Sequence, residues 1–121
     1  MKFKLFIIII LLLGFVIFSL TGVVSKQDLT RTRIKSLGYE ISQYIQKGGS
    51  VNNNILKELP KYPRKDNSVA DGWGRPFILE INNENIFLIS YGRDGLKGGA
   101  DKDKDFMIII NIISRKIKYV N

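Results

Sequence analysis

The sequence predicts an α+β protein. In it, a long N-terminal helix, transmembrane first and then amphipathic, packs on a small antiparallel sheet of three to four strands. Three observations predict this fold. An uncharged apolar run opens the chain, apolar residues recur at helical spacing over 28–47, and short apolar runs separated by turn residues fill the second half. The amphipathic helix and the sheet each have an apolar face to bury, so we expect them to pack together.

The opening run is long enough to cross a bilayer. Residues 5–25 carry no charge, and at about 1.5 Å per residue such a helix spans about 30 Å, the thickness of a bilayer core. A cleavable secretion signal usually has a shorter apolar region of about 7–15 residues. The run therefore predicts a retained single-pass anchor over residues 1–25 and a domain over 26–121. Basic residues stand on both sides of the run, so charge leaves the orientation open.

A helix is predicted over 28–47, with Asp28 as its N-cap and Gly48-Gly49 at its end. Apolar residues at steps of three and four share one of its faces: Ile34, Leu37, Ile41 and Ile45. A short second helix is predicted over 52–59, where Pro60 stops it. A polar connector then leads to a tight turn over 71–76, which holds the only tryptophan.

The rest of the chain predicts a meander. Strands are expected over 77–81, 86–91, 106–113 and 117–120, joined by turns and by one long loop over 92–104. The nearly continuous apolar character of 106–113 favours an interior place in the sheet. Trp73 is interpreted as a core residue rather than a platform that stacks on a ligand.

Composition excludes several function classes. The 121 residues include 19 Lys and Arg, 11 Asp and Glu, and no His or Cys. Disulfides, zinc-thiolate sites, thiol nucleophiles and histidine-dependent catalytic triads are therefore excluded. The basic residues are scattered without interleaved aromatic residues, so nucleic acid is not expected as a partner, and a surface near anionic lipid explains the charge. No small-molecule substrate is expected either, and we predict that the protein is not an enzyme.

The long loop contains an acidic cluster of four residues within 94–105: Asp94, Asp101, Asp103 and Asp105. Clustered carboxylates repel one another unless a cation lies among them, and Ca²⁺ takes six to eight oxygen ligands. An EF-hand is excluded, since Phe106 and Ile112 stand where that loop needs glycine and glutamate. The alternative is a solvated turn whose acidic charges are offset by Lys97, Lys102 and Lys104.

Two motifs carry a family resemblance. Asp-Gly-Trp-Gly-Arg-Pro-Phe over 71–77 is followed, after a hairpin, by Ser-Tyr-Gly-Arg-Asp-Gly over 90–95 and by Gly98-Gly99. Over about residues 28–106 the chain resembles the C-terminal domain of the type II secretion major pseudopilin family. That resemblance implies a long helix, a small antiparallel sheet and a Ca²⁺ site in the loop at about 90–105. The implied ligands are Asp94 and Asp101, with Asp103 or Asp105 behind them, and the backbone carbonyl of Tyr91.

The N-terminus departs from this family's pattern. A pseudopilin has a Gly-Phe cleavage site before its apolar helix and a glutamate at the fifth mature position. Here Gly14-Phe15 lies inside the apolar run, and the fifth residue counted from Phe15 is Ser19. The chain is therefore expected to be a divergent or minor member, or the same domain on a plain membrane anchor.

Together these features predict a membrane-anchored, pseudopilin-like structural protein of a type II secretion or pilus-like assembly, stabilised by Ca²⁺. Its partners are expected to be the membrane and other pseudopilin or secretion-system subunits, further copies of itself included. Its location is expected to be the bacterial cytoplasmic (inner) membrane, with the C-terminal domain on the periplasmic or extracellular side. The alternative is an anchored protein-interaction module that does not polymerise.

Overall fold

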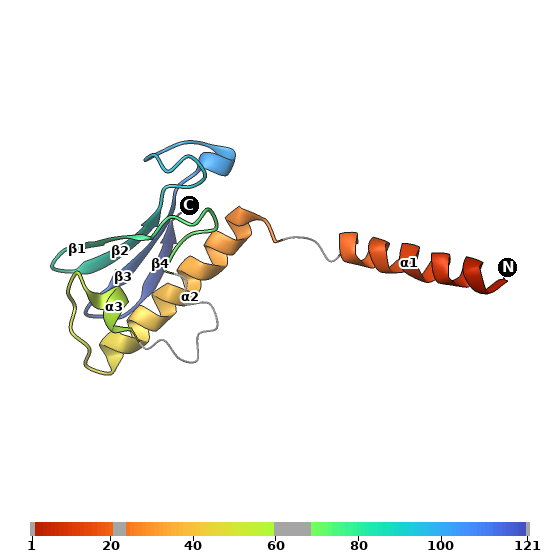
Figure 1. The fold of residues 1–121 in the computed structure, drawn as a ribbon. Helices are drawn as coiled ribbons and strands as arrows, with labels where there is room; N and C mark the ends of the chain where they lie inside the picture. The colour runs from red at the N-terminus through yellow and green to blue at the C-terminus, as the bar shows by residue number, and fades with distance from the viewer. Residues whose placement is uncertain (1, 21–23, 60–68, 121) are drawn as a thin grey trace.

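The structure is a computed structural model that describes residues 2–20, 24–59 and 69–120 of the chain. Its elements follow one another as α1 (Lys2–Leu20), α2 (Lys26–Gln46), α3 (Ile55–Glu58), β1 (Ile78–Ile81), β2 (Asn85–Ser90), the short 3₁₀ helix η1 (Asp101–Asp103), β3 (Phe106–Asn111) and β4 (Ile117–Val120). The four strands form one antiparallel sheet in the order β1-β2-β3-β4, and α2 lies along one face of it (Figure 1). The predicted α+β class and the antiparallel meander are confirmed.

The helix α2 begins two residues earlier than predicted. Asp28 is not its cap: the Ser25 side chain accepts a hydrogen bond from the Asp28 N–H at 3.1 Å and is the N-cap. Asp28 instead lies in the first turn, where its charge is favourable to the helix dipole and pairs with Arg31 at 2.7 Å. The helix ends at Gln46, one residue before the predicted end, and Lys47 is its C-cap ahead of the glycine pair.

The strand β3 occupies an interior place between β2 and β4, as its apolar sequence predicted. It ends at Asn111 rather than at residue 113. The Asn111 side chain accepts hydrogen bonds from the N–H groups of Ile113 and Ser114 at 3.1 and 2.7 Å, which turns the chain. Ile113 is consequently 81% exposed instead of being part of the strand.

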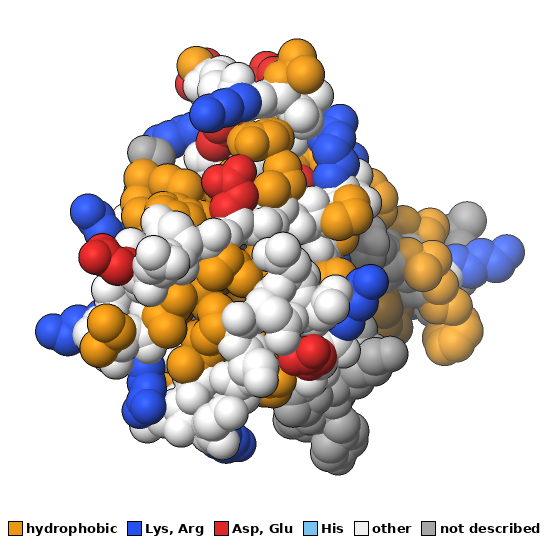
Figure 2. Space-filling view, turned by 90° about the vertical axis from the view of Figure 1, so that its left-hand side faces the viewer, with side chains coloured by type: hydrophobic (Ala, Val, Ile, Leu, Met, Phe, Trp, Pro, Cys, Tyr) orange, Lys and Arg blue, Asp and Glu red, His pale blue; other side chains and the backbone are white. Residues whose placement is uncertain are grey.

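One hydrophobic core lies between α2 and the sheet. Its buried members come from α2, from α3 and the residue after it, from the residue before β1, and from the inward-facing positions of β2 and β3: Ile34, Leu37, Ile41, Ile45, Ile55, Leu59, Phe77, Ile86, Leu88, Phe106, Ile108 and Ile110. The predicted apolar face of the long helix is thus the face that is buried. From the side on which β1 lies in Figure 1, hydrophobic side chains also reach the surface, with Lys, Arg, Asp and Glu side chains around them (Figure 2).

None of the α1 side chains that the structure describes belongs to this core. Its large apolar side chains from Phe3 to Val16 are exposed to between 43 and 75%. Among the residues that the structure describes, no helix combines the length and the apolar character needed to cross a membrane. The boundary predicted at residue 25 stays a prediction.

Candidate functional site

The tight turn around Trp73 is built on a buried carboxylate. Asp71 is 2% exposed. Its Oδ1 accepts hydrogen bonds from the N–H groups of Trp73 and Arg75, both at 3.0 Å, and its Oδ2 accepts from the Ser90 hydroxyl at 2.8 Å. Asp71 therefore fixes the turn and joins it to the end of β2, where the acidic loop begins. Sequence reasoning assigned it only to the turn.

The same turn is docked on the first turns of α2. The Gly72 N–H donates to the hydroxyl of the buried Thr30 at 2.8 Å, and that hydroxyl donates to the Lys26 carbonyl at 2.7 Å. The Arg33 guanidinium donates to the Asp71 carbonyl at 3.1 Å. A Cβ at position 72 would collide with the Lys26 carbonyl group, so only glycine allows this close approach.

Arg75 carries the connection from the turn to the acidic loop. Its Nη1 donates to the backbone carbonyls of Gly92 and Arg93, at 3.1 and 2.8 Å. These two carbonyls open the loop that contains the acidic cluster. Arg75 was missed from sequence, because an arginine inside a turn motif gives no sign of which residues 17 and 18 positions away it will reach.

The loop holds its acidic side chains in different ways. Asp94 accepts from the Leu96 N–H at 3.0 Å, and Asp105 accepts from the Gly98 N–H at 2.8 Å. Asp101 has a left-handed backbone (φ 52°) at the start of η1, and its carbonyl accepts from the Gln27 side chain on α2 at 2.8 Å. Tyr91 is partly buried immediately before the loop.

Asp103 is paired with Arg93. Both of its carboxylate oxygens accept from the guanidinium, at 2.9 Å from Nε and 3.1 Å from Nη2. This hydrogen bonding lowers the pKa of Asp103 and raises the pKa of Arg93. The charge of Asp103 is therefore offset by Arg93.

The direction of that pKa shift sets its effect on stability. Because the folded-state pKa of Asp103 lies below the unfolded value, its contribution to stability is present above the unfolded pKa and is lost as the pH falls through the folded pKa. At neutral pH Asp103 is ionised, and both of its carboxylate oxygens accept hydrogen bonds from Arg93. Of the acidic residues, it is the one with the least unused capacity to bind a cation.

Asp105 differs in a way that bears on metal binding. Its Oδ1 is buried and has no hydrogen-bond partner among the described residues. A buried carboxylate oxygen without a donor is costly, and a hard cation such as Ca²⁺ is a suitable partner for it. In the part of the chain that the structure describes, however, no three acidic side chains come close enough to hold a metal. The donor set thus meets part of what Ca²⁺ requires, with Asp105 fitting better than Asp103.

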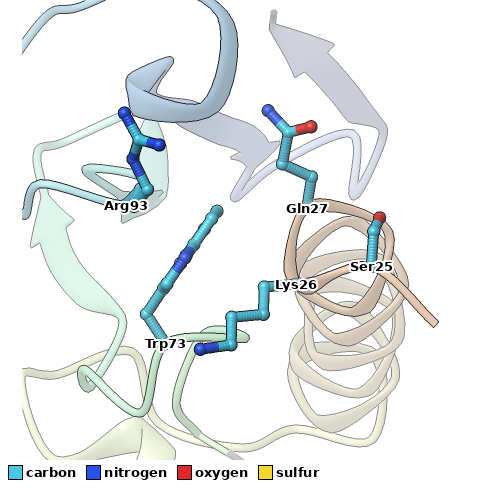
Figure 3. Close-up of a pocket in the computed structure, with 5 residues that line it drawn as sticks. All are labelled: Ser25, Lys26, Gln27, Trp73 and Arg93. Atoms are coloured by element: carbon cyan, nitrogen blue, oxygen red, sulfur yellow. The ribbon is translucent and has the colours of Figure 1, made fainter. Parts of the chain in front are cut away.

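A pocket of about 300 Å³ lies between the loop and the start of α2, lined by Ser25, Lys26, Gln27, Trp73 and Arg93. The Trp73 ring projects into the space between the α2 residues and Arg93 (Figure 3). Trp73 is also partly buried against the core, as its predicted role as a core residue requires. The pocket marks where the Trp73 turn, the loop and α2 meet.

A long helix on an antiparallel meander, with an acidic loop fixed by the Trp73 turn, defines a pseudopilin-like α+β domain. The family described as type II secretion system (T2SS), protein G matches residues 22–109, more than half of the chain, and the chain belongs to that family. The predicted family is thereby confirmed. No match to a curated protein or to a solved structure was found. The family is structural rather than catalytic, and membership indicates a pseudopilin role with other secretion-system subunits as partners.

Proposed function

We propose that the chain is a membrane-anchored structural subunit of a type II secretion or related pilus-like assembly. The family match over residues 22–109 carries this proposal. The exposed apolar side chains of α1 support an anchor, because such a surface is stable in a lipid bilayer and not in water. The domain from α2 to β4 would lie on the periplasmic or extracellular side of the bacterial cytoplasmic membrane, where Ca²⁺ is plentiful.

A second candidate is an anchored interaction module that binds secretion subunits without polymerising. It is favoured by the N-terminal sequence, in which Ser19 stands where a pseudopilin cut after Gly14 would carry its glutamate. That glutamate neutralises the terminal amine of a neighbouring subunit in an apolar filament core, where an unpaired charge is costly.

Deletion of the gene from its bacterium tests the proposed role. Loss of type II cargo from the culture medium is expected, with restoration by the full chain. The full chain should also remain in the membrane fraction after carbonate washing, with the domain open to protease on the outer side of that membrane. Normal cargo secretion, or a domain protected with the cytosol, would contradict the proposal. Secretion that fails while no polymer of the chain is isolated would favour the second candidate.

We further propose that the loop binds one Ca²⁺ through Asp94, Asp101, Asp105 and the Tyr91 carbonyl. Between the two residues left open by the sequence, Asp105 is the better ligand, because its Oδ1 is unpartnered whereas Asp103 is held by Arg93. Ca²⁺ would have to draw these carboxylates together, and when bound it would offset their negative charge. The fold would gain stability, since an ion that binds only the folded state shifts the unfolding equilibrium.

A thermal melt of the full chain in detergent, followed by the fluorescence of Trp73, tests this site. Ca²⁺ at a hundred times its dissociation constant stabilises the fold by about 2.7 kcal/mol, which raises the Tm by about 11–22 °C for a domain of this size. Mg²⁺ should give a smaller rise, and chelator should remove it. Asp94→Ala and Asp105→Asn should each lose most of the rise, whereas the matched variant Asp103→Asn should keep it.

Both the Ca²⁺ melt and the comparison of variants have a result that would contradict the proposed site. An equal Tm with Ca²⁺ and with chelator would make the acidic cluster a solvated turn. If Asp103→Asn removes the rise in Tm and Asp105→Asn preserves it, Asp103 and not Asp105 is the ligand.

A further inference from the structure

The face of the sheet turned away from α2 is mostly apolar. The strand register places two rows of side chains on this face, one residue from each strand in each row. We call these eight residues the outer face: Ile78, Ile89, Met107 and Val120 in the first row, and Glu80, Phe87, Ile109 and Lys118 in the second.

This composition is unusual for a sheet covered by a helix on its other side. Such antiparallel sheets normally alternate between apolar residues facing the core and polar residues facing water. Here the first row is entirely apolar, and the second has charges only at its two ends, Glu80 on β1 and Lys118 on β4. None of the eight is among the described members of the core beneath α2. Of the six apolar residues on this face, Ile89 is 8% exposed and the other five are half-buried. A second apolar face of this kind marks a surface that packs against another protein.

We propose that the outer face packs against the outer face of a second copy of this chain. The two charged residues, Glu80 and Lys118, indicate which partner fits this face. They lie at opposite edges of the same row, so the face is complementary to itself: a two-fold axis parallel to the strands places β1 of one copy over β4 of the other. Glu80 then lies opposite Lys118 of the second copy, twice in each dimer, while apolar positions meet apolar positions.

The same charges select against the other face-to-face arrangement. A two-fold axis running across the strands would place Glu80 over its own copy and Lys118 over its own copy. Like charges in direct opposition destabilise an interface and suppress that pairing. Two sheets packed in the favoured way lie about 10 Å apart with their strands nearly aligned.

Self-association through the outer face depends on the sheet alone. It needs neither the Ca²⁺ site nor the membrane anchor. It can therefore fail while the proposed secretion role stands, and it can hold if the loop binds no ion.

Cross-linking tests the geometry directly, because the chain contains no cysteine. Full chain carrying Glu80→Cys and full chain carrying Lys118→Cys are mixed in detergent micelles and treated with a short bismaleimide. The mixture should give a covalent dimer that contains one copy of each variant, and neither variant alone should cross-link efficiently. Efficient cross-linking of each variant with itself would overturn the proposed axis. Absence of any dimer would overturn the inference and leave the face to a different partner.

Charge reversal tests the interaction by sedimentation in the same detergent. Both side chains are exposed, so the fold should survive Glu80→Lys and Lys118→Glu. Each single change replaces two attractive pairs by two repulsive ones and should weaken self-association by at least about tenfold, whereas the double variant should restore it. Phe87→Ser should abolish self-association.

Ile113→Ser is the matched control. Ile113 is 81% exposed and lies in the turn after β3, outside the outer face. Self-association should be unchanged in this variant. If Ile113→Ser weakens it as much as Phe87→Ser does, or if the double charge variant fails to recover, association is not through the outer face.

Discussion

Asp71→Ala should lower the free energy of unfolding by about 3 kcal/mol or more. The substitution removes the acceptor for three hydrogen bonds at a site where the side chain is almost wholly buried. Two backbone N–H groups and one hydroxyl would lose their partner, and each costs about 1–3 kcal/mol when left unsatisfied. Denaturant unfolding of the full chain in detergent measures the change.

Asp71→Asn is the matched variant. Its amide oxygen can still accept from Trp73 and Arg75, and its amide nitrogen can donate to the Ser90 hydroxyl, which also accepts from Gly92. The loss should be about 1 kcal/mol, since only the charge-assisted part of the bonding is removed. A cost below about 1 kcal/mol for Asp71→Ala would mean that this carboxylate does not hold the turn. Equal costs for the two variants would show that its charge, and not its hydrogen bonding, matters.

The secondary structure was predictable because local patterns determine it. The spacing of Ile34, Leu37 and Ile41 identified the buried face of α2, and the apolar runs identified the strands. The errors lie at element ends, where one side chain decides. Ser25 rather than Asp28 caps α2, and Asn111 turns the chain two residues before the apolar run ends.

The site was predictable only in its composition. The acidic cluster and the Trp73 turn could be read as motifs, but the bonds that position them join distant residues. Arg33 reaches Asp71 across 38 positions, and Gln27 reaches Asp101 across 74. Such contacts follow from how α2 lies on the sheet and leave no periodic signal in the sequence. The outer face was hidden for a related reason, since rows across four strands exist only once the register is known.

Closure of the acidic loop depends on one close backbone approach. Gly92 has a left-handed backbone (φ 75°) and is buried at the point where the loop begins. A Cβ there would lie 2.6 Å from the Lys104 carbonyl oxygen and 2.8 Å from the Asp103 carbonyl group, at the other end of the loop. The Gly92 carbonyl is also one of the two that Arg75 binds. Both ends of the loop and the Trp73 turn therefore meet at this glycine.

Gly92→Ala should consequently cost about 3 kcal/mol, the sum of about 1 kcal/mol for an alanine in the left-handed region and about 2 kcal/mol for overlap with backbone that cannot move aside. Gly98→Ala separates the two terms. Gly98 is also left-handed (φ 88°), but a Cβ there meets nothing within 4 Å, so this variant should lose only the first term. Denaturant unfolding measures both variants, and the Ca²⁺ melt should show a smaller rise for Gly92→Ala than for Gly98→Ala. Equal costs at the two positions would mean that contact between the loop ends does not hold the loop closed.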